Sequence, residues 1–153
     1  MKLFFLRHGE AEYHRDDDIR QLTEKGRHDV RRVANASRES LASVQHVLVS
    51  PIVRAQQTAE IACEEACIRV QRTTVDWLIH ESPLREALMA LAKLDGNVLL
   101  VGHQPLASKI VESLCDLHPG ETDIGTANLI AMEGEAFIAG AMQLQHHTRP
   151  ELS

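Results

Sequence analysis

An arginine and a histidine stand side by side in the segment MKLFFLRHGEAE, directly after a run of apolar residues. Arg7 and His8 end the run KLFFL, and Gly9 follows them. A guanidinium beside an imidazole contributes little to a hydrophobic core, but the two groups together can hold an anion through charge-assisted hydrogen bonds. A buried strand that ends in these residues therefore predicts an anion-binding site.

Two more residues of the same kind follow apolar runs further along the chain. Arg54 lies in SPIVRAQQT after HVLV, and His103 lies in VGHQP after NVLL. Taken singly, each has a plain structural reading, Arg54 as a surface residue of a first helical turn and His103 as part of a turn. Ligands of open α/β sheets, however, bind at the carboxyl ends of parallel strands. Three such ends together predict two arginines and two histidines around one tetrahedral dianion such as phosphate, beside a helix N-terminus.

These residues need a parallel sheet to bring them together, and the hydrophobic pattern predicts one. Nearly continuous apolar runs are typical of strands that helices cover on both faces, and longer segments of helical period separate them. Helix starts are expected at Thr23, at Ser50 with Pro51 and at Ser82 with Pro83. The expected strands are 2–6, 46–50, 68–73, 97–102, 129–133 and 136–144, and the expected helices are 23–43, 51–66, 83–94 and 105–115.

The alternation of strands and helices predicts an α/β fold, a three-layer sandwich with a mostly parallel central sheet flanked by helices. The last two strands are typical of a hairpin around Gly134, so one or both of them are expected to run antiparallel. The length of 153 residues fits a single domain, residues 1–153. The acidic run 15–18 is expected to be a mobile, solvated loop, and the tail after about His146 to be loosely held.

The composition limits the kinds of partner. A net charge of -6 and a pI of about 5.8 argue against binding to nucleic acid or to an anionic membrane, so a bound anion needs a local cationic pocket. No apolar run approaches the ~20 residues that span a bilayer, and KLFFL is too short for the core of a signal peptide. Cys63, Cys67 and Cys115 are odd in number and are expected to be buried thiols. We expect a monomeric cytoplasmic protein.

Four segments carry a resemblance to a known family. In their order and spacing, LRHGEAE, LTEKG, SPIVRAQQTAE and VGHQP resemble the landmarks of the histidine phosphatase superfamily, which has the phosphoglycerate mutase-like fold. The resemblance covers residues 2–115. The short chain and the segment DDIRQLTEKG are similar to the small phosphohistidine phosphatases of the SixA type. In that subgroup an arginine precedes Pro-Leu-Thr, whereas Gln21 follows Arg20 here.

The resemblance implies that His8 is the nucleophile. It would attack phosphorus and form a phosphohistidine intermediate, which water then hydrolyses. The residue types agree with this role, because neutral imidazole is a competent nucleophile near neutral pH and neighbouring cations disfavour its protonation.

The resemblance also implies how the phosphoryl group is held. Arg7, Arg54 and a protonated His103 would bind its oxygens and offset its charge in the transition state. Gly9 is expected to let the backbone approach the phosphate, and Arg20 is a further candidate for substrate binding. Because the two guanidiniums supply the positive charge, we expect neither a metal nor a cofactor.

The residue that protonates the leaving group is expected after Trp77, in the segment LIHESPLREAL, where His80 and Glu81 precede a helix. Glu81 is a possible general acid, and it could equally be a solvated residue near the helix start. The short chain leaves little for a lid, and an open pocket suits a phosphohistidine displayed on a partner protein, for example a histidine phosphotransfer domain.

Three alternatives remain open. The chain could be a small-molecule phosphomonoesterase of the same superfamily, or a phosphate-binding module whose catalysis has lapsed. A metal site formed by His8, His103 and Glu10 is the third alternative, which Arg7 and Arg54 disfavour because they would repel the cation.

Overall fold

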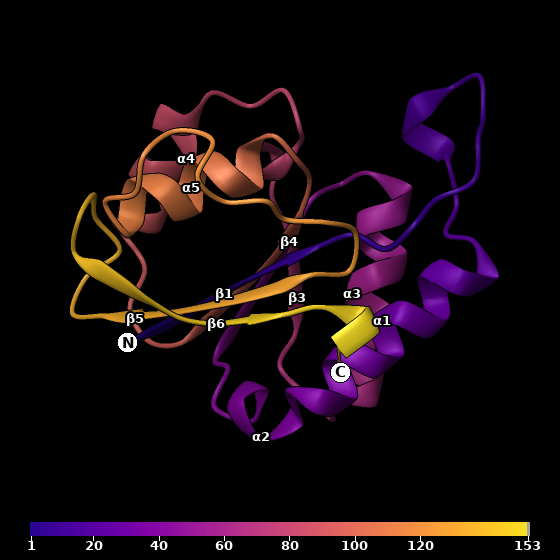
Figure 1. Cartoon of the computed structure of the whole chain (residues 1–153), viewed down its shortest axis with the longest axis horizontal. Helices are drawn as coiled ribbons and strands as arrows, with labels where there is room; N and C mark the ends of the chain where they lie inside the picture. The colour runs from indigo at the N-terminus through magenta and orange to yellow at the C-terminus, as the bar shows by residue number, and fades with distance from the viewer. Residues whose placement is uncertain (153) are drawn as a thin grey trace.

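A mixed six-stranded sheet forms the centre of the protein (Figure 1). The computed structural model describes residues 1–152, and the strands lie in the order β3–β2–β4–β1–β5–β6. β4 pairs in parallel with both β1 and β2, β2 pairs in parallel with β3, and β5 runs antiparallel to β1 and to β6. The strands are β1 Lys2–Arg7, β2 His46–Val49, β3 Arg72–Thr74, β4 Val98–Gly102, β5 Leu129–Gly134 and β6 Met142–Thr148.

Helices cover both faces of this sheet, which confirms the predicted three-layer α/β sandwich. One layer contains α1 Glu24–Ala36, α2 Arg38–Leu41 and α3 Val53–Glu65, and the other contains α4 Leu84–Leu91 and α5 Leu106–Leu114. Successive side chains of a strand point to opposite faces. Phe4 and Leu6 of β1 therefore pack with the first layer, and Leu3 and Phe5 pack with the second. Both layers thus fix β1, the strand that ends in Arg7.

The two edge strands lie elsewhere than predicted. The strand expected at 68–73 is Arg72–Thr74, and the one expected at 136–144 is Met142–Thr148. All of β3 and most of β6 are exposed, so neither shows the apolar pattern that marks a strand in sequence. Phe137 gave the expected last strand its apolar character, but it packs into the core from the turn between β5 and β6.

The C-terminal hairpin is confirmed, and both of its strands run antiparallel to their neighbours. The expectation of a loose tail after His146 is wrong. His146 and His147 belong to β6 and pair with Ala131 and Ile130 of β5. The His147 Nε2 atom also lies 2.7 Å from the Oδ1 atom of Asn128, which gives the end of β6 a polar anchor.

The first helix begins where the sequence predicts and ends earlier. Thr23 is the N-cap of α1, and its Oγ1 atom accepts a hydrogen bond of 2.9 Å from the backbone N–H of Gly26. The helix expected to continue to residue 43 breaks at Ser37, which separates α1 from α2. None of the helices in residues 1–152 is long and apolar enough to cross a membrane.

Two serines that were expected to cap helices bind other partners. The N-caps of α3 and α4 are Ile52 and Pro83, not Ser50 and Ser82. Ser82 donates its hydroxyl to the carbonyl of Asp76, at 3.1 Å. The Ser50 side chain is fully buried and lies at the carboxyl end of β2, in the candidate site.

Candidate functional site

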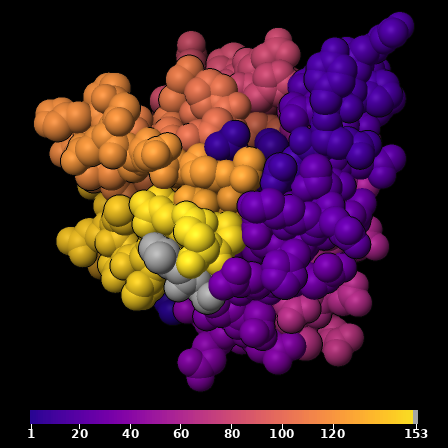
Figure 2. All heavy atoms as spheres, turned by 45° about the vertical axis from the view of Figure 1, so that its right-hand side comes forward, coloured from indigo at the N-terminus to yellow at the C-terminus, as the bar shows by residue number. Residues whose placement is uncertain are grey.

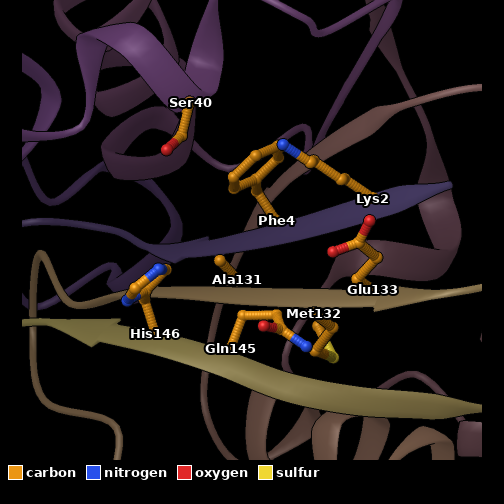
Figure 3. Close-up of a pocket in the computed structure, with 8 residues that line it drawn as sticks. All are labelled: Lys2, Phe4, Ser40, Ala131, Met132, Glu133, Gln145 and His146. Carbon is orange, nitrogen blue, oxygen red and sulfur yellow. The ribbon is translucent and has the colours of Figure 1, made fainter.

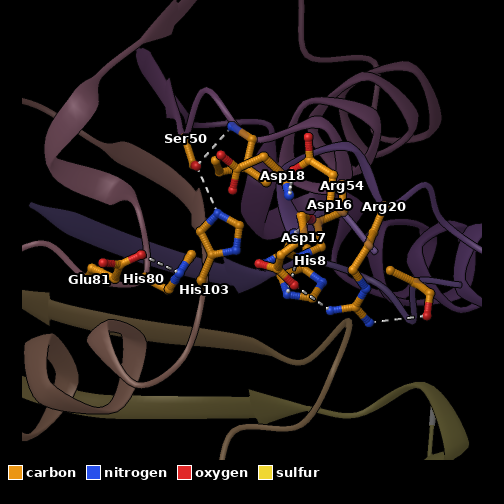
Figure 4. A network of polar contacts seen from close by, with 12 residues as sticks. His8, Asp16, Asp17, Asp18, Arg20, Ser50, Arg54, His80, Glu81 and His103 are labelled. Atoms are coloured by element: carbon orange, nitrogen blue, oxygen red, sulfur yellow. Dashed lines mark hydrogen bonds and ion pairs between the residues drawn. The ribbon is translucent and has the colours of Figure 1, made fainter. Parts of the chain in front are cut away.

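The order of the central strands brings the four predicted residues together, and Figure 4 shows three of them, His8, Arg54 and His103. Arg7 ends β1 directly opposite Gly102, the last residue of β4, so His8 and His103 leave neighbouring strands at the same edge of the sheet. Their ring centroids lie 5.1 Å apart. Arg54 comes from the first turn of α3, which follows β2 on the other side of β4. The sequence predicted this convergence, and the structure places all four residues at one edge.

The hydrogen bonds of His8 fix which nitrogen can act. Its Nδ1 atom lies 2.7 Å from the carbonyl oxygen of Gly9, and a carbonyl can only accept, so Nδ1 carries the proton. The Nε2 atom therefore holds the free electron pair. The Nε–H of Arg54 donates to this atom over 3.3 Å. The imidazole thus presents Nε2 to the interior of the site as an unprotonated nitrogen.

The surroundings of His8 keep the ring neutral. Its pKa is lowered from 6.5 to about 4, chiefly because the ring is buried and also because Arg54, Arg7 and Arg20 place positive charge nearby. The Gly9 carbonyl acts in the opposite direction. The predicted neutral imidazole is therefore confirmed, although burial contributes more to the shift than the cations do.

His103 is held through one nitrogen and leaves the other without a partner. The side chain is 1% exposed, and its Nε2 atom lies 2.7 Å from the Ser50 hydroxyl. That hydroxyl oxygen already accepts the N–H of Ile52 at 3.2 Å, so its own hydrogen can be donated to Nε2. In this arrangement the ring proton sits on Nδ1, which is shielded from solvent and has no hydrogen-bond partner. His103 can therefore donate to an anion while it is neutral.

The resemblance implied a protonated His103 beside the phosphoryl group, whereas the ligand-free structure favours the neutral ring. Its pKa is lowered to about 3, chiefly by burial, with smaller contributions from His8 and Arg54. The fold removes this ring from water before any anion binds, which disfavours the charged form.

The two guanidiniums are anchored by backbone carbonyls at their outer ends. Arg7 donates from Nη1 to the carbonyl of Ile124 at 2.8 Å, and its Nε atom is buried with no partner. Arg54 is 4% exposed and donates from Nη1 to the carbonyl of Asp17 at 2.8 Å. Its Nη2 atom also lies 3.1 Å from Oδ2 of the same residue.

The acidic run 15–18 was expected to be only solvated surface, and this is wrong for Asp17. The run forms a short 3-10 turn, Asp17–Ile19, in the indigo segment that projects from the molecule in Figure 2. The Asp17 carboxylate is half exposed, but it binds the guanidiniums of Arg54 and Arg20, each at 3.1 Å. The sequence offered only a weak signal for this role, namely three consecutive carboxylates just before Arg20.

Arg20, the further candidate for substrate binding, lies at the rim of the site. It donates to the carbonyl of Glu12 at 2.9 Å and is paired with Asp17 (Figure 4). Its charge contributes to the lowered pKa of His8, so it acts on the His8 ring through space.

Gly9 has a packing role that the sequence did not predict. A Cβ atom at this position would lie 2.8 Å from the carbonyl oxygen of Gly26 and 3.0 Å from a methyl group of Val30, both in α1. The Gly9 N–H donates to the Oγ1 atom of Thr58 at 3.1 Å. The missing side chain of Gly9 therefore makes room for helix α1, and the close approach of its backbone to a phosphate stays a prediction.

The possible general acid, Glu81, points into solvent. Its side chain is 79% exposed, and its Oε1 atom lies 3.0 Å from Nε2 of His80. His80 in turn packs edge-on against His103, with ring centroids 5.6 Å apart. Figure 4 places His80 between Glu81 and His103. The residue of this segment that borders the site is thus His80, for which the sequence predicted no role.

The site is suited to an anion more than to a metal ion. Among residues 1–152 no group of three or more His, Cys, Asp or Glu could hold a metal. Glu10, the third ligand of the metal alternative, lies 3.7 Å from the Lys25 ammonium instead. The buried N–H groups of Arg7 and His103 have no acceptor, and buried donors without acceptors are costly. A tetrahedral oxyanion between them would supply the acceptors.

A second pocket lies apart from these residues (Figure 3). It has a volume of about 90 Å³ and lies over β1, β5 and β6, beside Ser40 of α2. Lys2 and Glu133 line one end and His146 lines the other. None of the four predicted residues lines this pocket, so it is separate from the candidate anion site.

Comparison with known proteins agrees with the geometry. The family model of the histidine phosphatase superfamily (branch 1) matches residues 3–75. The chain is 32% identical to the phosphohistidine phosphatase SixA of Escherichia coli (strain K12) over 130 residues, which cover 80% of this chain and 77% of that protein. It is also 32% identical over 161 residues to an uncharacterized protein of Picosynechococcus sp., with 99% of this chain and 93% of that protein covered. The structure of the protein histidine phosphatase SixA complexed with tungstate is similar over 100% of both chains, with a TM-score of 0.88 and 27% identity.

Proposed function

The chain belongs to the histidine phosphatase superfamily, and from this premise we propose that it is a metal-independent phosphatase that removes the phosphoryl group from a phosphohistidine of a partner protein. The reaction proceeds through a phosphohistidine intermediate on His8. The observation that carries the proposal is the unprotonated Nε2 atom of His8, which faces the unpartnered donors of Arg7 and His103.

The first step is an attack of His8 Nε2 on phosphorus. A neutral ring is needed for this, and its lowered pKa of about 4 makes it available at neutral pH. Arg54, whose Nε–H lies 3.3 Å from Nε2, is placed to bind an oxygen of the phosphoryl group during the transfer. Arg7 and the Nδ1–H of His103 bind the other oxygens. Such fixed donors stabilise the charge of the transition state.

The second step is hydrolysis of the intermediate by water. The Nδ1 atom of His8 keeps its proton throughout, because it donates to the Gly9 carbonyl. His8 can therefore leave phosphorus as a neutral imidazole, with the electron pair of the broken bond on Nε2. Positive charge from Arg7 and Arg54 does the electrostatic work that a metal ion does in other phosphoryl transfers.

The relatives support a phosphohistidine as the substrate. One relative is named a phosphohistidine phosphatase, and the tungstate-bound structure belongs to a protein histidine phosphatase. We propose that the phosphohistidine belongs to a partner protein, such as a histidine phosphotransfer domain. We also propose that the reaction takes place in the cytoplasm. Cys63, Cys67 and Cys115 are free thiols, which is compatible with a reducing compartment.

A substrate comparison tests the proposal. The protein is incubated with a histidine phosphotransfer domain phosphorylated with ³²P, and separately with small phosphate esters, each with and without tungstate. We expect rapid release of phosphate from the domain, inhibition by tungstate and acid-labile label on His8. The His8→Ala variant should release no phosphate and trap no label, whereas His118→Ala, at an exposed site, should behave like the wild type. Efficient turnover of the esters together with inertness toward phosphohistidine would overturn the substrate assignment.

A further inference from the structure

The structure leaves three buried side-chain nitrogens without hydrogen-bond partners among the residues that it describes. Two of them belong to Arg7 and His103, which already form the proposed phosphate site. The third is the Nδ1 atom of His80. Buried polar atoms without partners are rare in native proteins and often mark a functional group whose partner is a ligand. His80 therefore belongs with the residues that need a bound group to complete their hydrogen bonding.

His80 is also placed where a leaving group would emerge. Phosphoryl transfer proceeds in line, with the nucleophile and the leaving atom on opposite sides of phosphorus. In Figure 4, His8 and His80 lie on opposite sides of His103, and each ring lies against the His103 ring, at 5.1 and 5.6 Å. A phosphoryl group held by His103 and attacked by His8 would direct its leaving atom toward His80.

The other nitrogen of His80 is bound to a carboxylate. The Nε2 atom lies 3.0 Å from Oε1 of Glu81, whose side chain is 79% exposed. In the doubly protonated ring that acts as a proton donor, Nε2–H donates to this carboxylate and the second N–H, on Nδ1, points away from it. Glu81 thus orients His80 and connects it to solvent, from which protons can be replenished.

We propose, on the basis of the phosphatase function above, that His80 is the proton-transfer residue of the reaction and that Glu81 is its positioning residue. In the first step the bond between phosphorus and the leaving atom breaks as the Nε2–P bond of His8 forms. The leaving atom keeps the electron pair and takes the proton from Nδ1 of His80. In the second step water attacks phosphorus, the Nε2–P bond breaks, and Nδ1 of His80 takes the proton that water releases. The ring ends as it began.

A series of aryl phosphates whose phenols differ in acidity tests this assignment. A weakly acidic phenol needs the proton, and a strongly acidic one leaves without it. We expect His80→Asn to lower kcat/KM for the weakest phenol by about 10²- to 10⁴-fold, the usual contribution of general acid catalysis, and to change it little for the most acidic phenol. The dependence of log kcat/KM on phenol acidity therefore becomes steeper. Glu81→Gln should also lower kcat/KM most for the weakly acidic phenols. The decrease should be smaller than in His80→Asn, because the imidazole of His80 remains in place.

Matched variants and a second readout separate this role from a structural one. His118→Asn and Glu86→Gln change exposed residues of the same types. Both variants should keep the wild-type dependence of log kcat/KM on phenol acidity. Stoichiometric label on His8 from the most acidic phenyl ester shows that the site of His80→Asn is folded. An equal loss for every ester, or an unchanged slope, would refute the role of His80 while the phosphatase function stands. Absence of label on His8 in the wild type, with the phosphorylated phosphotransfer domain as well as with every ester, would refute the phosphatase function and this proposal together.

Discussion

At the scale of single residues, the hydroxyl of Ser50 decides how His103 acts. It accepts the N–H of Ile52 and lies 2.7 Å from Nε2 of His103, so its own hydrogen can be donated to Nε2, and the ring proton then lies on Nδ1. A histidine of low pKa can in this way remain a donor without carrying charge. The same contact removes Ser50 from the capping position that its sequence context suggested.

Replacing Ser50 with alanine should affect both stability and anion binding. The Nε2 atom of the buried His103 ring would lose its partner, which costs about 1–3 kcal/mol, and the ring proton would no longer be held on Nδ1. We expect Ser50→Ala to lower the free energy of unfolding by this amount in urea denaturation and to weaken tungstate binding in calorimetry. Ser40→Ala, at an exposed serine of α2, is the control and should change neither. Unaltered tungstate affinity in Ser50→Ala would contradict the role given to the hydroxyl.

The residues that carry chemistry were predictable where their side chains follow buried strands. Arg7, His8 and His103 stand directly after apolar runs, so the topology of parallel strands was enough to bring them together. His80 and Asp17 lie in irregular segments, whose paths depend on packing that no local pattern encodes.

At the scale of elements, the 3-10 turn that contains Asp17 lies against helix α3 and places a negative charge beside the candidate anion site. The Asp17 carboxylate binds Nη2 of Arg54 and Nη1 of Arg20, each at 3.1 Å. These guanidiniums hold the pKa of the carboxyl below its ordinary value, so it stays charged at neutral pH. A bound dianion would be repelled by it.

Removing this charge should tighten oxyanion binding. Asp17→Asn keeps an oxygen that can accept from Arg54 but removes the repulsion, and the effect of a partly exposed ion pair is roughly 0.5–1 kcal/mol. We expect tungstate to bind about two- to fivefold more tightly in calorimetry at low salt, with the gain reduced at high salt. Asp18→Asn changes the net charge by the same amount one residue away and should produce a smaller gain. Equal gains in both variants would mean that overall charge, and not the contact with Arg54, is responsible.

The elements themselves were predictable to the extent that they are buried. β1, β2 and β4 begin and end within one or two residues of their expected bounds, because both faces of each are covered and the sequence is apolar throughout. The edge strands β3 and β6 were misplaced, because exposure removes that pattern. The break at Ser37 in the first helix was missed for a different reason, because the helical spacing of apolar residues continues through it.

At the scale of the whole molecule, the two buried histidines link stability to pH. Both have an ordinary pKa of 6.5 when unfolded, and in the native protein the values are lowered to about 4 for His8 and about 3 for His103. Between these limits the unfolded chain binds protons that the native protein does not. The free energy of unfolding therefore falls as the pH is lowered through this window, and these two groups have little effect above it.

Denaturant unfolding measured across this pH window checks the linkage. We expect the stability of the wild type to decrease steadily as the pH falls from neutrality toward the native pKa of His8. His103→Asn should show a weaker pH dependence, whatever its stability at neutral pH, whereas His118→Asn at an exposed site should keep the wild-type dependence. An identical pH dependence in His103→Asn and the wild type would show that the pKa of His103 is the same in the native and unfolded protein, which contradicts the lowered native value.

The position of β4 between β1 and β2 has a consequence for how the protein is made. Arg7, His8 and Arg54 leave the ribosome well before residues 98–103, yet β1 and β2 are joined only through the strand that separates them. A nascent chain that ends before this strand has three of the four groups, but it lacks His103 and the strand that joins β1 to β2 in the sheet. We therefore expect the ability to capture an oxyanion to arise late in translation, when the missing central strand enters the sheet.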